Sequence, residues 1–202
     1  IALSKQEMGF WIEDMYLPSE KGINISSTMG DGIYFMIDMF RETAGFLDFD
    51  IDLPFDTDIY FGIGETITSL RVRTSMDGRQ FACVYHGKKG RNHFTHRFRR
   101  IAGRYLQVQI LAPSATLYYA GIIPTEYKVE DKGGFVCDDT LHNKIYEVAK
   151  RTLQLCMHEH YEDCPWREQA LYALDSRIEM LATYYAFGDT NFAKESLRLF
   201  AL

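Results

Sequence analysis

The spacing of apolar residues changes near residue 124, and this change divides the chain into two parts. Before it, short runs of alternating apolar and polar residues are separated by turn signals. In the segment 46–53, Leu, Phe and Ile alternate with Asp48, Asp50 and Asp52, which predicts a half-buried strand with one face in water. Strands that recur about every ten residues are typical of an antiparallel sandwich. Residues 1–124 are therefore predicted to form a β-sandwich domain.

The candidate strands of this first part are bounded by turn signals such as Asp77–Gly78 and Lys88–Gly90. They are Gly9–Leu17, Ile33–Phe40, Gly45–Leu53, Asp58–Ile63, Ile67–Thr74, Gln80–His86, His93–Arg99, Tyr105–Leu111 and Thr116–Ile122.

After a polar linker, residues 125–134, the apolar period becomes helical, and residues 135–202 are predicted to form a helical domain. Asp138 or Asp139 can cap a first helix that runs to about Met157. The predicted fold class is thus α+β, with an antiparallel β-sandwich followed by helices.

A second helix is expected from Asp163-Cys-Pro165 to about Phe187, because proline is tolerated in a first helical turn. Gly188 can end this helix, and Asp189 or Thr190 can cap a third. The second helix has an apolar stripe that is expected to face the core: Leu171, Leu174, Ile178, Leu181 and Tyr185.

Charge and composition argue against two classes of partner. The chain has 22 Lys and Arg against 28 Asp and Glu, and this acidic balance disfavours nucleic acid because phosphate binding needs a positive field. The basic and aromatic run 88–104 is better interpreted as a solvated strand face or as a partner of acidic residues. No apolar run approaches the roughly 20 residues of a membrane span.

The cysteines and the chain ends leave other questions open. Cys83, Cys137, Cys156 and Cys164 have no zinc-type spacing and suit either buried thiols or disulfides, so the compartment and the oligomeric state are not predicted. The chain begins at Ile1 and ends inside a helical pattern. We expect it to be a piece of a longer protein.

The densest polar cluster is the segment 158–168, with two histidines, four carboxylates and a thiol. His158 and His160 lack the i, i+4 spacing of a common zinc motif, so a polar loop whose Asp163 caps the next helix is favoured over a metal site.

A line of polar residues follows on the second predicted helix. Glu168, Tyr172 and Asp175 are spaced i, i+4 and i+7, which predicts that they share one helical face. Acidic groups with an aromatic neighbour suit acid–base chemistry on a sugar, and Trp166 could stack on an apolar sugar face. The alternatives are a solvated acidic face paired with Arg167 and Arg177, and a core tryptophan.

The segment Asp163-Cys-Pro-Trp-Arg-Glu-Gln-Ala-Leu-Tyr-Ala-Leu-Asp175 resembles the motif that opens the catalytic groove of the bacterial α-L-rhamnosidases, family 78 of the glycoside hydrolases. Gly134–Asn143 is similar to the family's entry into its helical domain. The segments 38–45 and 98–106 look like strands of the preceding β-domain. The resemblance covers most of the chain after about residue 33.

This resemblance implies a β-sandwich and the beginning of an (α/α)6 toroid, in an inverting hydrolase that removes terminal α-L-rhamnose or a related sugar. It implies that Glu168 is the general acid and that the base comes from a downstream segment, so this chain alone is expected to be inactive. No metal or cofactor is expected. The predicted sugar-binding residues are Asp163, Trp166, Arg167, Tyr172 and Asp175. A non-catalytic carbohydrate-binding or scaffold protein with the same fold is the alternative.

Overall fold

The computed structural model describes residues 21–27, 30 and 32–202. The candidate strand Gly9–Leu17 therefore lies outside the described residues. The chain divides into two compact units, Ile1–Pro124 and Thr125–Leu202, which are described separately.

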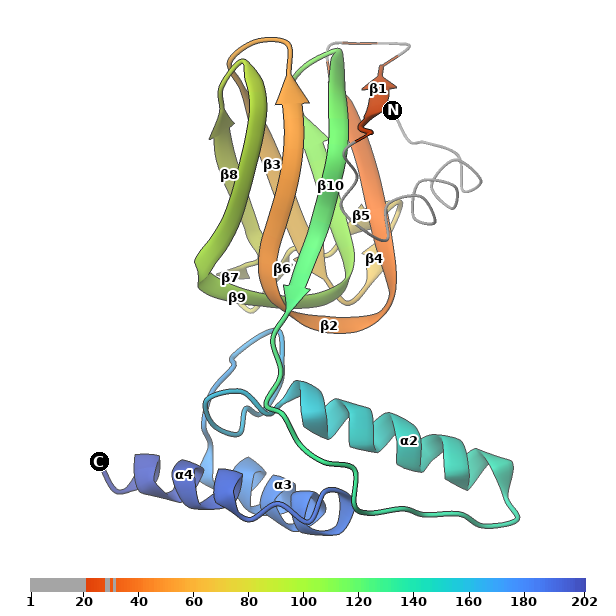
Figure 1. Cartoon of the computed structure of the whole chain (residues 1–202), viewed down its shortest axis with the longest axis vertical. Coiled ribbons are helices and arrows are strands. Elements are labelled where there is room, and N and C mark those ends of the chain that lie inside the picture. The colour runs from red at the N-terminus through yellow and green to blue at the C-terminus, as the bar shows by residue number, and fades with distance from the viewer. Residues whose placement is uncertain (1–20, 28–29, 31) are drawn as a thin grey trace. The chain divides into compact units, whose positions relative to one another are not determined.

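The first unit is built on one antiparallel six-stranded sheet with the strand order β1-β10-β2-β9-β3-β8 (Figure 1). Two small hairpins accompany it, β4 (Ile67–Thr68) with β5 (Arg71–Val72) and β6 (Ser75–Met76) with β7 (Arg79–Gln80). The strands of the large sheet are β1 (Ile23–Ser26), β2 (Ile33–Leu53), β3 (Thr57–Gly64), β8 (Ala82–Gly87), β9 (Gly90–Ile110) and β10 (Ser114–Pro124).

The two longest strands, β2 and β9, run through both layers of this unit. Ile33–Asp38 of β2 pairs with the end of β9, whereas Thr43–Leu53 pairs with its beginning. The register breaks between Asp38 and Thr43, where Phe40 adopts a φ of 63° and donates its N–H to the Asp38 carboxylate. β3 and β8 extend one half, and β10 and β1 extend the other. Figure 1 shows both long strands curving through the same end of the unit.

The expected antiparallel α+β class is confirmed, but the sandwich is made by a single curled sheet. Segments predicted as separate strands, such as Ile33–Phe40 and Gly45–Leu53, are the two halves of one bent strand. The sequence pattern predicts a strand end at this bend, because the alternation of apolar and polar residues is lost there. In the structure, the β-ladder resumes within a few residues.

The core of this unit lies between the two halves of the sheet. Phe49 is completely buried and stacks on Phe61 of the other half, with ring centroids 4.7 Å apart. Tyr85 meets the same ring edge-on at 4.9 Å. The predicted alternation in 46–53 is confirmed for the apolar face, which joins the hydrophobic cluster.

Two aspartates on the opposite face of that strand, Asp48 and Asp50, have cross-strand partners. Asp50 accepts two hydrogen bonds from Arg91, and Asp48 accepts one from the Thr95 hydroxyl. Arg104 is paired with Asp38 in the same way. Part of the basic run 88–104 is thus paired with aspartates of the sheet.

Replacing Phe49 with Ala is expected to lower the free energy of unfolding of the β-unit by about 3–5 kcal/mol, because it empties the contact between the two halves of the sheet. Urea unfolding followed by far-ultraviolet circular dichroism measures this loss. Phe98→Ala is the matched control: Phe98 is fully exposed, so its loss is expected to change stability by less than about 0.5 kcal/mol. Similar losses for both variants would contradict the packing described here.

The second unit contains α2 (Thr140–Leu155), α3 (Ala173–Ala186) and α4 (Asn191–Phe200). Asp139 caps α2 by accepting hydrogen bonds from Leu141 N and His142 N, as one of the two predicted caps. Gly188 ends α3 with a φ of 63°, as predicted. Thr190 is the N-cap residue of α4 without a side-chain bond, and the Asp189 carboxylate accepts the Phe192 N–H instead.

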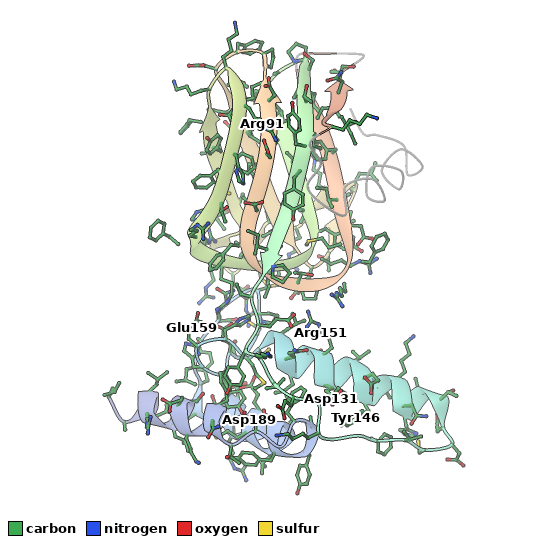
Figure 2. All side chains as sticks on the ribbon, viewed as in Figure 1. Arg91, Asp131, Tyr146, Arg151, Glu159 and Asp189 are labelled. Carbon is green, nitrogen blue, oxygen red and sulfur yellow. The ribbon has the colours of Figure 1, made fainter. Side chains whose placement is uncertain are left out.

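The segment predicted as a linker is extended and held against the helices. Tyr127 donates its N–H to Met157 O, and its ring lies 4.4 Å from that of Phe192. Lys150 of α2 pairs with Asp131 at 2.8 Å. Figure 2 labels Arg151 and Tyr146 of α2 and Asp131 of this segment.

Leu171 of the predicted buried stripe precedes α3 and packs against the hydrophobic cluster, but the prediction is wrong for the other four residues. Ile178 is 59% exposed and Tyr185 is 82% exposed, and Leu174 and Leu181 are also exposed. The face that packs on Met157, Tyr161 and Phe192 is instead formed by smaller or more polar residues: Ser176, Met180, Thr183 and Ala186. No helix within the described residues has the length and apolar character needed to cross a membrane.

Candidate functional site

The segment 163–172 is a compact loop and not the first turns of a helix. Asp163 N donates to Ala170 O, and the Asp163 carboxylate accepts the Ala170 N–H in return at 3.0 Å. The loop requires a φ of 53° at Gln169, a left-handed conformation that interrupts a helix. α3 therefore begins at Ala173, and the prediction of a helix from Asp163 is corrected. We refer to residues 163–170 as the Asp163 loop.

The Asp163 loop holds Glu168 with its side chain only 12% exposed. Its Oε2 accepts a hydrogen bond from Arg167 Nε at 2.6 Å and one from the Cys164 thiol at 3.1 Å. The Glu168 N–H in turn points to Cys164 Sγ at 3.3 Å. Contacts within the loop thus hold the Glu168 carboxyl in place. The ion pair with Arg167 is one of the alternatives that the sequence left open.

The three residues predicted to share a helical face do not share one. Glu168 lies in the loop, Tyr172 is the extended N-cap residue of α3, and Asp175 is in the first turn. Tyr172 is 48% exposed and presents its ring to solvent. Trp166 is only 4% exposed, which corrects the expectation that it offers a stacking surface at a site entrance.

A metal-like grouping is present in the same loop. Ligand atoms of Asp163, Cys164 and Glu168 lie within 4.8 Å of one another. Burial is the main cause that raises the pKa of Cys164, which disfavours the thiolate that a metal requires. We interpret the group as a hydrogen-bonded cluster that shapes the loop.

The two histidines of the polar segment each bond a backbone carbonyl. His158 Nε2 lies 2.9 Å from Leu155 O, and His160 Nδ1 lies 2.8 Å from Tyr161 O. Because a carbonyl oxygen only accepts, each of these ring nitrogens carries the proton and cannot be a metal ligand.

Further acidic groups lie beneath the loop. Glu162 is 1% exposed, and its N–H donates to Cys156 O. Burial first, then the charges of Asp175, Asp163 and Glu162, raise the pKa of Glu179 to about 8. Burial also raises the pKa of Cys156 to about 12. No local sequence pattern indicated that Glu162 would be buried near the half-buried Glu179.

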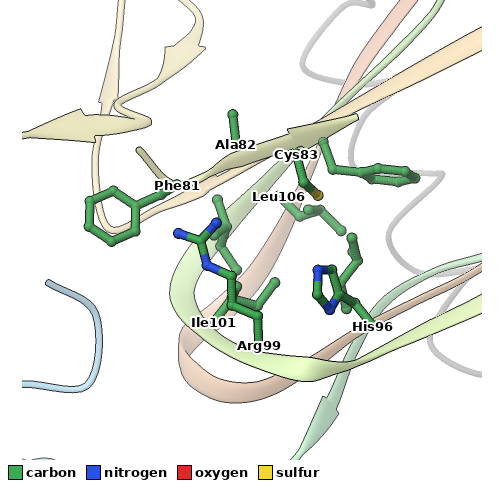
Figure 3. A pocket seen from close by; sticks show the side chains of 10 residues that line it. Phe81, Ala82, Cys83, His96, Arg99, Ile101 and Leu106 are labelled. Carbon is green, nitrogen blue, oxygen red and sulfur yellow. The ribbon is translucent and has the colours of Figure 1, made fainter. Parts of the chain in front are cut away.

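The β-unit has a small hollow of its own (Figure 3). Cys83, His96 and Arg99 line it together with apolar side chains, and it encloses about 10 Å³, enough for about one water molecule. Arg99 donates to Gln80 O beside it. The hollow is too small for a sugar, so the Asp163 loop is the stronger candidate site.

The Asp163 loop lies within a region of the chain that matches a known protein family. Residues 130–201 match the bacterial α-L-rhamnosidase six-hairpin glycosidase domain. The GH78 rhamnosidase structure from Bacillus sp. GL1 superposes with a TM-score of 0.79 and 26% identity over 93% of this chain. Over most of its length the chain is thus similar to a GH78 rhamnosidase.

Two other similar proteins are also rhamnosidases. An α-L-rhamnosidase of Formosa agariphila is 29% identical over 83 residues, or 41% of this chain. A Klebsiella oxytoca rhamnosidase, solved with rhamnose bound, shares the fold at a TM-score of 0.69 and 22% identity over 89% of this chain. The chain spans 8% of the Formosa protein, 20% of the Bacillus chain and 37% of the Klebsiella chain. The suspected family resemblance is thus supported, and the β-unit belongs to the matched region of the structures.

Asp163→Ala is expected to loosen the Asp163 loop, because Ala170 loses the acceptor of its N–H. Hydrogen exchange followed by nuclear magnetic resonance (NMR) is expected to show a roughly 5- to 30-fold loss of protection at the Ala170 amide, equivalent to about 1–2 kcal/mol. Asp163→Asn keeps an acceptor oxygen and is expected to lose much less. Equal protection in wild type and Asp163→Ala would contradict the role of the Asp163 carboxylate in closing the loop.

Glu179 gives the helical unit a pH dependence of stability. Its pKa is raised from 4.5 to about 8 in the folded state, so the folded state is favoured while the proton is held and loses stability as the pH rises from 4.5 through 8. Glu179→Gln removes this titration. The difference in unfolding free energy between variant and wild type is expected to move in the variant's favour from about pH 5 to about pH 9. A difference that is the same at both pH values would contradict the burial of this carboxyl.

Proposed function

We propose that this chain carries the acid side of the active site of an inverting glycoside hydrolase that removes terminal α-L-rhamnose or a related sugar. The observation that carries the proposal is the match of residues 130–201 to the α-L-rhamnosidase six-hairpin domain, since this region contains the Asp163 loop. The Bacillus relative, which is similar over 93% of the chain, supports the same activity class.

In this proposal Glu168 donates a proton to the glycosidic oxygen as the bond to the anomeric carbon breaks. A general acid must hold its proton when the substrate is bound, and an ion pair favours the ionised carboxyl. Arg167 therefore has to turn away from Glu168 when the sugar binds. Its side chain is 39% exposed, so part of it can face the hydroxyl groups of a sugar.

The remaining contacts come from the rim of the loop. Tyr172 offers an exposed ring for an apolar sugar face, and Asp175 and Asp163 offer carboxylates to hydroxyl groups. Trp166, being buried, supports the loop from within and is not proposed to stack on the sugar.

Inversion requires a second carboxylate about 6.5–9.5 Å from the acid, on the opposite face of the sugar, to activate water. We propose that this base lies outside residues 1–202 and that the 202-residue chain alone does not hydrolyse rhamnosides. No cofactor or metal takes part in this scheme.

The acid role of Glu168 has a distinctive kinetic signature in the intact natural protein. Glu168→Gln is expected to lower kcat/KM by about 10²–10⁴-fold on an alkyl α-L-rhamnoside, whose leaving group needs a proton. The loss on a nitrophenyl α-L-rhamnoside is expected to be much smaller, since nitrophenolate leaves without protonation.

Glu147→Gln is the matched control, because Glu147 is an exposed glutamate of α2 and its removal is expected to leave both rates unchanged. An equal loss on both substrates after Glu168→Gln would contradict the acid role. Binding of rhamnose without hydrolysis by the intact protein would favour the alternative, a carbohydrate-binding protein that retains the fold.

A further inference from the structure

Glu179 is a half-buried residue with a buried carboxyl oxygen, and the proposed chemistry does not use it. It lies on α3 one turn after Asp175 and three residues after Ser176, which is 1% exposed. Glu179 Oε2 and Ser176 Oγ are both buried and have no hydrogen-bond partner among the described residues. An ionised carboxylate in that position would lack the donors that stabilise its charge.

Within the described residues, the titratable groups that act on Glu179 come from three parts of the helical unit and are acidic or neutral. Asp175 lies on its own helix, and Asp163 and Glu162 come from the segment that leads into the loop. Cys156 at the end of α2 and the Tyr161 hydroxyl also experience the Glu179 charge. Each acidic neighbour raises the pKa of Glu179, as does burial, so the side chain is predominantly neutral at pH 7.

One of these neighbours, Asp163, is the residue that closes the loop. Its carboxylate accepts the Ala170 N–H, and a carboxylate accepts best when ionised. A second negative charge behind it would repel this carboxylate and weaken its hold on the Ala170 N–H.

We propose that Glu179 is a positioning residue: in its neutral form it leaves the Asp163 carboxylate in place against Ala170, where it holds the loop that presents Glu168. When Glu179 loses its proton, its charge repels Asp163, the bond to Ala170 weakens, and the loop opens. The effect on loop order concerns the fold alone, whereas its effect on rhamnoside cleavage rests on the proposed function.

The Ala170 amide reports this coupling directly, by NMR of the full 202-residue chain. In the wild type its proton chemical shift is expected to titrate with a midpoint near 8, the pKa of Glu179, and its protection against exchange to fall above that pH. Glu179→Gln, which resembles the neutral carboxyl, is expected to abolish the step while keeping the loop closed. Asp175→Asn removes one like charge and is expected to move the midpoint to lower pH.

Glu147→Gln on the exposed face of α2 is the control and is expected to keep the wild-type titration. An Ala170 amide that does not titrate in the wild type would overturn the proposal. A titration that survives Glu179→Gln would overturn it as well, because the proton would then belong to another group.

The consequence for catalysis is measured separately, in the intact protein. Loss of kcat/KM above about pH 8 is expected in the wild type, and Glu179→Gln is expected to shift this alkaline limb upward while leaving KM at neutral pH unchanged. An Ala170 titration without rhamnoside hydrolysis would support the positioning role and contradict the proposed function. Hydrolysis with an identical alkaline limb in the variant would contradict the positioning role alone.

Discussion

The candidate site depends on the pair of hydrogen bonds between Asp163 and Ala170. One bond joins backbone N–H to backbone carbonyl, and the other joins the Asp163 carboxylate to the Ala170 N–H. Together they close an eight-residue loop in which Glu168, Arg167 and Cys164 contact one another. Without this closure Glu168 would be on a flexible segment, and a general acid has to be held within hydrogen-bond reach of the oxygen it protonates.

The same closure explains why the acidic groups beneath the loop are buried together. The loop turns the chain back so that Asp163 lies near Glu179 of α3, and Glu162 enters the interior beside Cys156. Like charges at such a place raise pKa values, and perturbed carboxyls gather at functional sites more often than elsewhere. In the β-unit, the core lies between the two halves of one curled sheet.

The sequence predicted the elements that depend on local chemistry. The change of period near residue 124, the Asp139 cap and the Gly188 terminus are each visible in a few residues, because caps and alternation are local effects. The predictions from the sequence were wrong where contacts between residues far apart in the chain determine the structure. The apolar spacing suggests one continuous helix from Asp163. The left-handed conformation of Gln169 and the hydrogen bonds between Asp163 and Ala170 interrupt it, so α3 begins ten residues later than Asp163. Ile178 and Leu181 of the apolar stripe of α3 are exposed, and the helix buries Met180, Thr183 and Ala186 instead. The composition of the Asp163 loop pointed to the site, but the arrangement of its side chains could only come from the structure.

The central claim is that the Asp163 loop serves an inverting rhamnosidase. The measurement that tests it most directly is the anomeric configuration of the first product, followed by proton NMR while the intact natural protein cleaves an aryl α-L-rhamnoside. The account predicts that β-L-rhamnose appears first and then mutarotates. Initial release of α-L-rhamnose, or no release of rhamnose at all, would contradict it.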